Sequence, residues 1–202
     1  MNKAILMSIK PEWVAKILCE EKTIEIRKKF PKDYVGWVYI YCTKAEPYLI
    51  PTSERDRAFW EERKIDIGTA LNGKVVARFW CDKVEEIEIK QQRGWNYPTD
   101  DTIFETKTLN PIELLEKSCL SYNKLNNYLD NEGYAIHITK LEIFDEPKKL
   151  KRFVYYSKGN GSWCSWLNCI YLDHTKEECE NCKDIHLQKA PQSWCYIEEN
   201  LR

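Results

Sequence analysis

The stretch KPEWVAKILCEEKTIEIRKK, residues 10–29, decides the fold because its hydrophobic period changes half-way along it. Pro11 stands at a first helical position, where its missing N–H costs nothing. The residues after it place one apolar stripe on a helix, formed by Trp13, Val14, Ile17 and Leu18. This half of the stretch therefore predicts a helix of about three turns with one buried face.

The second half predicts a strand with charge on one face. From residue 23 the period is two, so that Ile24 and Ile26 point one way while Glu25 and Arg27 point the other. Together with Lys22, these charges form either a solvated strand face or the floor of a polar pocket. In a pocket, Arg27 could grip a phosphate or a base edge, and a partly desolvated Lys22 could donate a proton or act as a nucleophile. The alternative is an ion pair of little energetic value.

Three motifs of the N-terminal region resemble the ASCH domain, a branch of the PUA-like superfamily of small β-barrels. They are SIKPEW at residues 8–13, KTIEIR at 22–27 and GWVYIYCTK at 36–44. The segment APQSWCYIEE at residues 190–199 resembles the closing segment of the longer, phage-associated members. The family pattern has glycine two residues before the lysine, where this chain has Glu20. Because glycine would suit a left-handed helix cap, we expect this helix to end differently.

The composition narrows the classes of partner. The chain has 202 residues, with 31 Lys and Arg against 32 Asp and Glu, so its formal net charge is −1. Any contact with nucleic acid must then come from a local basic face rather than a global field. The start MNKAILMSIK has no apolar signal region, and no apolar run is long enough to cross a bilayer. We expect a cytoplasmic protein without a membrane partner.

The remaining pattern predicts many short strands and a few helices. Strands are expected at residues 4–9, 37–41, 74–81, 84–89, 134–138 and 141–144, and helices at 53–64 and 111–128, with Ser121 capping a second helix in the latter. Residues 90–111 have little period and predict a long loop, typical of a lid or rim. The class is α+β or mostly β. The resemblance implies one PUA-like small β-barrel over residues 1–202, with flanking helices and a cysteine-containing insert.

A cluster of cysteines predicts a structural zinc site in that insert, at about residues 160–185. Four of the nine cysteines fall there: Cys164, Cys169, Cys179 and Cys182. Two pairs of thiolates separated by a loop can converge on zinc, and the segment has little apolar surface to fold on without a metal. His174 or His186 could replace one thiolate, and four free thiols are the alternative. A catalytic zinc is not expected, because four sulfur ligands leave no open position.

The resemblance implies binding of RNA or of a modified nucleotide, because the cleft beside a PUA-like barrel binds such ligands. Its floor here would be Lys22, Glu25 and Arg27. The other candidate binding residues are Ser8, Lys10, Tyr41, Thr43, Lys44, Arg78, Gln192 and Ser193. Arg78 shares a strand face with Trp80, a pairing suited to stacking a base, and an amide such as that of Gln192 can read a base edge. The basic run at residues 148–152 is either a solvated face or a phosphate contact.

Enzymatic alternatives come from the same family. Some small ASCH proteins are amidohydrolases that act on an acylated cytidine with a lysine, a threonine and a glutamate of another strand. Lys22 matches the lysine, but Glu25 fills the threonine's place, so the expected nucleophile is missing. If the chain is an enzyme, Lys22 and Glu25 are its catalytic candidates. The candidates for the glutamate of another strand are Glu85, Glu86 and Glu88. A ribonuclease and a module that docks a protein partner are the remaining alternatives.

Overall fold

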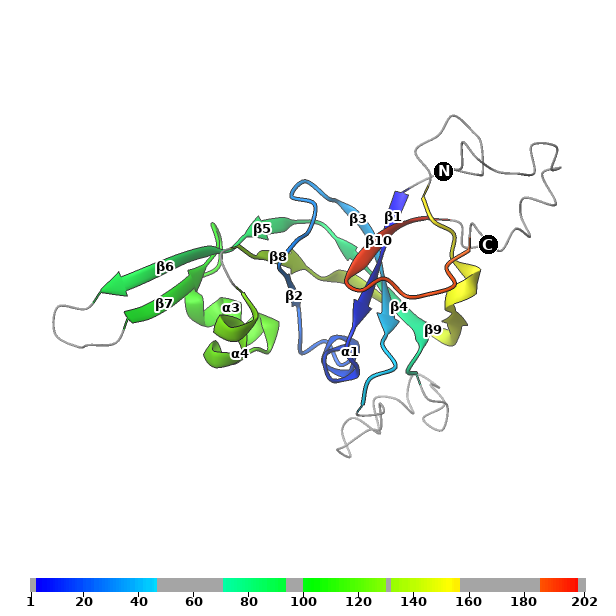
Figure 1. Ribbon diagram of the computed structural model, residues 1–202, viewed down its shortest axis with the longest axis horizontal. Helices are drawn as coiled ribbons and strands as arrows, with labels where there is room; N and C mark the ends of the chain where they lie inside the picture. The colour runs from blue at the N-terminus through cyan, green and yellow to red at the C-terminus, as the bar shows by residue number, and fades with distance from the viewer. Residues whose placement is uncertain (1–2, 47–70, 94–99, 130–131, 157–185, 200–202) are drawn as a thin grey trace. The chain divides into compact units, whose positions relative to one another are not determined.

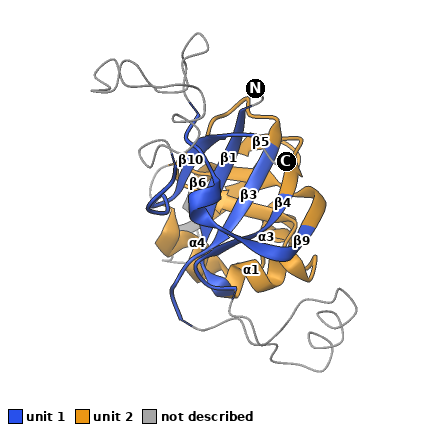
Figure 2. Cartoon of the chain, turned by 90° about the vertical axis from the view of Figure 1, so that its right-hand side faces the viewer, with its two compact units in different colours: residues 1–11, 37–78, 143–202 blue, residues 12–36, 79–142 orange. Residues whose placement is uncertain are grey.

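The computed structural model describes five parts of the chain (Figure 1): residues 3–46, 71–93, 100–129, 132–156 and 186–199. Its contacts divide the chain into two compact units, coloured separately in Figure 2. Unit 1 comprises residues 1–11, 37–78 and 143–202, and unit 2 comprises residues 12–36 and 79–142. Each unit has its own hydrophobic core.

Unit 1 contains most of a five-stranded mixed sheet, in the order β10-β1-β3-β4-β9. Its strands are β1 (Lys3–Ile9), β3 (Gly36–Cys42), β4 (Lys74–Cys81), β9 (Thr139–Lys149) and β10 (Trp194–Glu198). Strand β1 pairs in parallel with β3 and antiparallel with β10. Because β1 is an inner strand buried on both faces, its sequence KAILMSI is a nearly continuous apolar run.

The core of unit 1 gathers on this sheet around Tyr39. Its buried members are Ala4, Leu6, Tyr39, Tyr41, Val75, Phe153, Leu187 and Ile197. Phe153 follows a 3-10 helix, η1 (Leu150–Arg152), and its ring lies 5.5 Å from that of Tyr39 in an edge-on arrangement. Edge-on rings at this distance stabilise a core beyond their buried area.

Unit 2 combines helices with a three-stranded antiparallel sheet in the order β2-β8-β5 and a two-stranded ribbon. The helices are α1 (Pro11–Leu18), α3 (Pro111–Ser118) and α4 (Tyr122–Tyr128), and the sheet strands are β2 (Ile24–Arg27), β5 (Val84–Glu86) and β8 (Tyr134–His137). The ribbon consists of β6 (Glu88–Arg93) and β7 (Asp100–Glu105). The core includes Ile24 and Ile26 of β2, with Leu114 of α3 and Leu125 of α4. Ile24 and Ile26, predicted to share one face of a strand, both belong to this core.

Helix α1 ends with a left-handed cap, although its sequence lacks the glycine that such a cap favours. Glu20 has φ 59°. The N–H of Glu20 donates to the carbonyl of Ile17 and that of Glu21 to the carbonyl of Lys16, both at 2.9 Å. These are the two hydrogen bonds of a Schellman motif, with Glu20 where glycine is preferred. The expectation of a different helix end is therefore wrong, because the hydrogen bonds of the cap outweigh the steric cost of a side chain.

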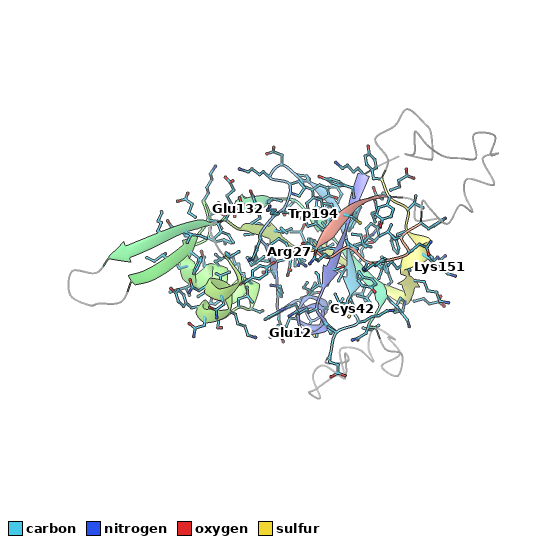
Figure 3. The ribbon with its side chains drawn as sticks, in the orientation of Figure 1. Glu12, Arg27, Cys42, Glu132, Lys151 and Trp194 are labelled. Atoms are coloured by element: carbon cyan, nitrogen blue, oxygen red, sulfur yellow. The ribbon has the colours of Figure 1, made fainter. Side chains whose placement is uncertain are left out.

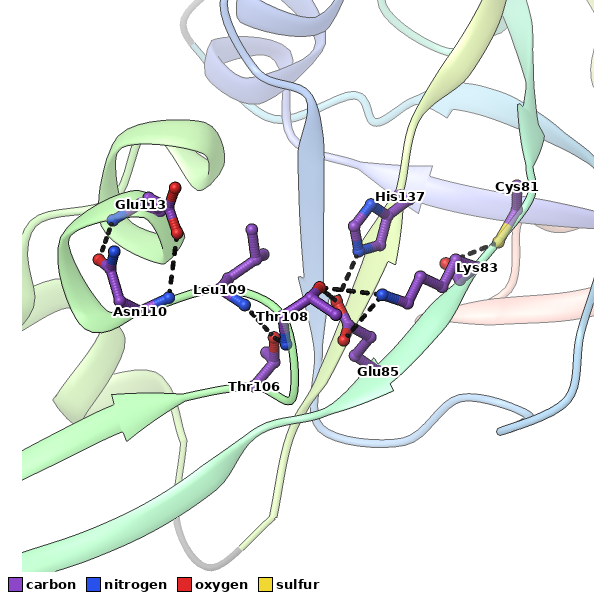
Figure 4. Close-up of polar contacts among 9 residues, drawn as sticks. All are labelled: Cys81, Lys83, Glu85, Thr106, Thr108, Leu109, Asn110, Glu113 and His137. Atoms are coloured by element: carbon purple, nitrogen blue, oxygen red, sulfur yellow. Dashed lines mark hydrogen bonds and ion pairs between the residues drawn. The ribbon is translucent and has the colours of Figure 1, made fainter.

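The N-terminal caps of the other two helices follow from their sequences. At α3, the Asn110 side chain accepts from the N–H of Glu113, whose carboxylate accepts in turn from the N–H of Asn110 (Figure 4). This capping box satisfies two backbone donors at once. Ser121 caps α4 by accepting from the N–H of Lys124, as predicted.

Three expected boundaries differ from the structure. Residues 90–111, expected as a loop, contain the end of β6, all of β7 and the start of α3. Residues 84–89 divide between β5 and β6, and the strand expected at 141–144 is part of the longer β9. The ribbon was missed because only a few of its residues, such as Ile89 and Phe104, face the core, so its sequence has little hydrophobic period.

The mostly β class with flanking helices is confirmed. Over the described residues, the strands form three sheets with linear strand orders rather than one closed barrel. The helix expected at 53–64 lies outside the described residues. None of the described helices has the length and apolar character needed to cross a bilayer.

Candidate functional site

The charged residues around β2 form a linked triplet in unit 2. The Glu25 carboxylate bridges two cations: its Oε2 lies 3.3 Å from Lys22 Nζ, and its Oε1 lies 3.1 Å from Arg27 Nη2. Exposure differs among the three side chains, at 2% for Lys22, 7% for Glu25 and 12% for Arg27, the member labelled in Figure 3. The predicted pair of Lys22 with Glu25 is confirmed, and both of its members are buried.

Lys22 is held from two further sides. Its ammonium donates to the carbonyl of Ser118 at 2.6 Å, at the C-terminus of α3, where the helix dipole favours a cation. It also lies 5.4 Å from the ring centroid of Trp13, within cation–π distance. Burial lowers the pKa of Lys22, while the Glu25 carboxylate opposes this shift. The lysine is thus desolvated yet fully partnered.

Arg27 is the most exposed member of the triplet, at 12% of its side chain. A carboxylate fixed between two cations holds the guanidinium in one orientation, and Lys22 offsets the charge of that carboxylate. Thr23, beside Lys22 in the sequence, is exposed, whereas Lys22 and Glu25 are buried. Solvent therefore reaches Arg27 more than it reaches the buried pair of Lys22 and Glu25.

A second buried carboxylate, Glu85, lies on the other face of the same sheet. The register places Glu25 in one row with Ile136 and Val84, and Glu85 in the adjacent row with Ala135. Because adjacent rows alternate between faces, the side chains of Glu25 and Glu85 point to opposite sides. Of the candidates for a third catalytic residue, Glu85 therefore does not join Lys22 and Glu25.

Glu85 is the centre of its own polar cluster (Figure 4). Its Oε2 accepts from Thr108 Oγ1 at 2.7 Å and lies 2.9 Å from His137 Nε2, while its Oε1 lies 3.0 Å from Lys83 Nζ. Burial alone would raise the pKa of Glu85, but hydrogen bonds from Thr108, His137 and Lys83 hold it down at about 2. His137 thus has the structural role that its place in an apolar strand predicts.

The other two glutamate candidates pair with exposed lysines. Glu86 shares a face with Arg27, because both lie in one row with Tyr134, and its carboxylate forms an ion pair with Lys32. The Glu88 carboxylate lies 3.2 Å from Lys90 Nζ on the ribbon. Neither has the burial that would tune a carboxylate for proton transfer.

Unit 1 brings together two of its predicted residues, Ser8 and Ser193. The Ser8 N–H donates to the carbonyl of Ser193 at 2.9 Å, and its hydroxyl donates to the carbonyl of Pro191 at 2.6 Å. Tyr41 is buried in the core, and burial raises the pKa of its hydroxyl. The N–H of Thr43 donates to the carbonyl of Ile9. The exposed candidates of this unit are Lys10, Lys44 and Gln192.

Arg78, also in unit 1, lies against rings that sequence reasoning missed. Its guanidinium carbon is 4.0 Å from the ring centroid of Trp37, and Nη1 donates to the Tyr39 hydroxyl at 3.0 Å. Both rings belong to β3, whereas Arg78 belongs to β4. The sequence of β4 alone could suggest only Trp80 as an aromatic partner of Arg78. The alternation of residues within one strand does not show which strand pairs with it.

The four predicted zinc ligands, Cys164, Cys169, Cys179 and Cys182, lie outside the described residues, so that site stays a prediction. Within the described parts of the chain, no three His, Cys, Asp or Glu side chains gather as a metal site. The five described cysteines are free thiols. Burial raises the pKa of Cys42 and Cys81 to about 12 and that of Cys195 to about 11, so these three are poor nucleophiles at neutral pH.

Comparison with known proteins gives matches among solved structures. No family model and no curated protein matches the chain. It is similar to ASCH from Zymomonas mobilis, at 13% sequence identity and a TM-score of 0.43, with 73% of each chain covered. A mutant of that protein matches at 13% identity and a TM-score of 0.42, with 74% of this chain and 77% of that chain covered.

Proposed function

We propose that the protein binds RNA or a modified nucleotide, and that Arg27 makes the specific contact. The supporting observation is the Lys22–Glu25–Arg27 triplet, in which two buried charges orient a third that reaches the surface. A guanidinium presents donors in a planar fork that matches a phosphate or the edge of a guanine. Fixing that fork in advance lowers the entropy that binding must overcome.

The cost of this arrangement argues for a role beyond stability. Taking each charged group out of water costs several kcal/mol even after relaxation, and apolar residues of similar volume often stabilise a fold equally well. A lysine whose pKa burial lowers, beside a specific carboxylate, is also typical of functional sites. The triplet therefore fits a recognition site better than a simple structural ion pair.

The test is a titration of the purified chain with nucleosides, modified nucleosides and short single-stranded RNAs. Arg27→Ala should weaken binding of the preferred ligand by about 1–3 kcal/mol if the contact is bidentate. Arg27→Lys should weaken it by a similar amount, because a lysine keeps the charge and loses the fork. Calorimetry or fluorescence anisotropy measures both.

Lys29→Ala is the matched control, since it removes an exposed cation two residues further along the chain. The affinity of Lys29→Ala for the preferred ligand should remain within about twofold of that of the wild type, because a single exposed charge contributes little to binding. Equal affinities of the wild type and both Arg27 variants for every ligand that binds would contradict the proposal.

A hydrolase is the second candidate, and the buried lysine is the one observation in its favour. A lysine with a lowered pKa can act as a base or a nucleophile at neutral pH. Against this, its ammonium is bound to Ser118 and Glu25, and Glu85 faces the other side of the sheet. Release of the acyl group from an acylated cytidine by the wild type, lost in Lys22→Arg, would favour this candidate; cleavage of RNA would favour a ribonuclease.

A further inference from the structure

Unit 1 gathers three cations around a group of aromatic rings, and we name this set the Arg78 cluster: Arg78, Lys148, Arg152, Trp37 and Phe144. Arg78 lies over Trp37, and Lys148 Nζ lies 4.2 Å from the ring centroid of Phe144. Tyr39 joins the two pairs, since its hydroxyl accepts from Arg78 and its ring centroid lies 6.2 Å from that of Phe144. Four strand or helix segments, β3, β4, β9 and η1, contribute to the cluster.

The side chains of the cluster are positioned by the sheet yet reach solvent. Trp37, Phe144 and Lys148 are half-buried, Arg152 is exposed, and Arg78 keeps 22% of its side chain exposed. Trp37 and Phe144 pack against the core of unit 1, which includes the buried Tyr39. Cations over half-buried rings thus form a rigid surface rather than a set of loose side chains.

Positive charge in this cluster is only partly balanced. The Glu199 carboxylate lies 3.8 Å from Arg78, and Glu146 is on the same strand as Lys148. Among the described residues, no carboxylate lies within ion-pair distance of Lys148 or Arg152. Burial lowers the pKa of Lys148, and the charges of Arg152 and Arg78 lower it further. Like charges held together in this way favour an anion that would relieve their repulsion.

We propose that the Arg78 cluster binds the phosphate backbone of a single-stranded RNA, with a base stacking beside Trp37 or Phe144. Basic side chains that follow the backbone and rings that stack bases are the two parts of a single-strand binding surface. With a formal net charge of −1, the chain needs such a local basic face to attract a polyanion. This inference rests on the proposed function, because it takes the partner to be nucleic acid. It differs in assigning the phosphate backbone of that partner to the Arg78 cluster rather than to Arg27.

The experiment measures anisotropy of a labelled single-stranded 12-residue oligouridylate against the full chain at several salt concentrations. Lys148→Ala and Arg152→Ala should each weaken binding about fivefold and reduce the slope of log K against log salt by about 0.7, the value for one phosphate contact on a single strand. Lys149→Ala is the matched control, because it removes an exposed cation next to Lys148 on the other face of β9. Its slope should equal that of the wild type.

Two results would overturn the inference: equal slopes for Lys148→Ala, Arg152→Ala and Lys149→Ala, or no binding of the oligonucleotide by the wild type. Equal affinity for a duplex RNA would overturn the assignment to single strands, because a duplex cannot offer a base to Trp37 or Phe144. Thermal unfolding of each variant confirms that it folds.

An abasic strand separates this inference from the proposed function. Such a strand keeps every phosphate, so its binding should depend on Lys148 and not on discrimination between bases. If Lys148→Ala weakens binding of the abasic strand while Arg27→Ala changes no nucleoside affinity, the cluster is confirmed and the Arg27 site is wrong. The reverse pattern would confirm the Arg27 site and overturn the cluster.

Discussion

The Lys22–Glu25–Arg27 triplet of unit 2 and the Arg78 cluster of unit 1 are both built from basic side chains, but their charges are balanced differently. In the triplet, a buried carboxylate lies between its two cations, and the burial of Lys22 is nearly complete. In the cluster, Arg78 and Lys148 lie over rings, and one carboxylate lies 3.8 Å from Arg78. The first region buries its charges around a shared carboxylate, whereas the second leaves its cations partly or fully exposed.

The difference predicts opposite consequences for removing a cation. Taking a lysine from the triplet leaves Glu25 buried with one partner fewer, which is costly because a buried charge needs its partner. Taking a lysine from the cluster removes a repulsion and costs the fold little. Stability measurements therefore test the comparison independently of any ligand.

The largest expected effect is at Lys22. Lys22→Ala should lower the free energy of unfolding by about 3–5 kcal/mol, the usual cost of breaking a buried ion pair, whereas Lys148→Ala should change it by less than about 0.5 kcal/mol. Urea unfolding followed by tryptophan fluorescence measures both. If Lys22→Ala loses no more unfolding free energy than Lys148→Ala, the proposed difference between the triplet and the cluster is wrong.

The double variant Lys22→Met with Glu25→Gln is the control for this prediction. It leaves no charge buried without a partner at these two positions, and the amide can still accept from Arg27. Its free energy of unfolding should exceed that of Lys22→Met alone by at least about 1 kcal/mol, because directly contacting charges are coupled by energies of this size.

The next largest effect concerns Glu85, the second buried carboxylate of unit 2. Its pKa falls from 4.5 to about 2 on folding, so its contribution to stability is complete above pH 4.5 and is lost as the pH falls toward 2. At 1.36 kcal/mol per pKa unit, the contribution above pH 4.5 is at most about 3 kcal/mol, and solvent around the exposed Lys83 reduces it. The free energy of unfolding of the wild type should therefore exceed that of Glu85→Gln at pH 6, and the difference should shrink by pH 3.

Acid unfolding of Thr108→Val gives the matched comparison for this window. That variant removes one of the three hydrogen bonds to Glu85, so the acid loss should move to a higher pH. Identical acid unfolding profiles for the wild type, Glu85→Gln and Thr108→Val would contradict the prediction, because they would show that the hydrogen bonds to Glu85 do not lower its pKa.

Some parts of both regions could be predicted from the sequence because local pattern determines them. The change from a helical to a two-residue period between α1 and β2 places Ile24 and Ile26 on one face of the strand and Glu25 on the other. The burial of Glu25 itself is not visible in that pattern, because it depends on the segments packed over that face. The pairing of Lys22 with Glu25 follows from their closeness in sequence. The cap at Ser121 likewise needs only its own turn.

The rest depends on contacts between segments distant in sequence. Ser118, whose carbonyl accepts a hydrogen bond from Lys22, lies 96 residues further along the chain. No pattern in either segment predicts that the two are in contact. The opposite faces of Glu25 and Glu85 follow only from the register of β2, β8 and β5. The rings that contact Arg78 could be predicted only if β3 were known to be the neighbour of β4 in the sheet.

The smallest expected effect concerns Glu20, whose left-handed cap leads the chain from α1 to Lys22. Glu20→Gly should raise the free energy of unfolding by about 1 kcal/mol, because glycine adopts φ 59° without the steric cost that a side chain carries. Glu21→Gly is the matched control: Glu21 has no positive φ, so glycine there only adds freedom to the unfolded chain and should destabilise by a few tenths of a kcal/mol or more. If Glu20→Gly gains stability and leaves ligand binding unchanged, the triplet owes its geometry to the hydrogen bonds of Lys22 rather than to strain in the cap. A loss of stability in Glu20→Gly would mean that the glutamate side chain itself stabilises the cap.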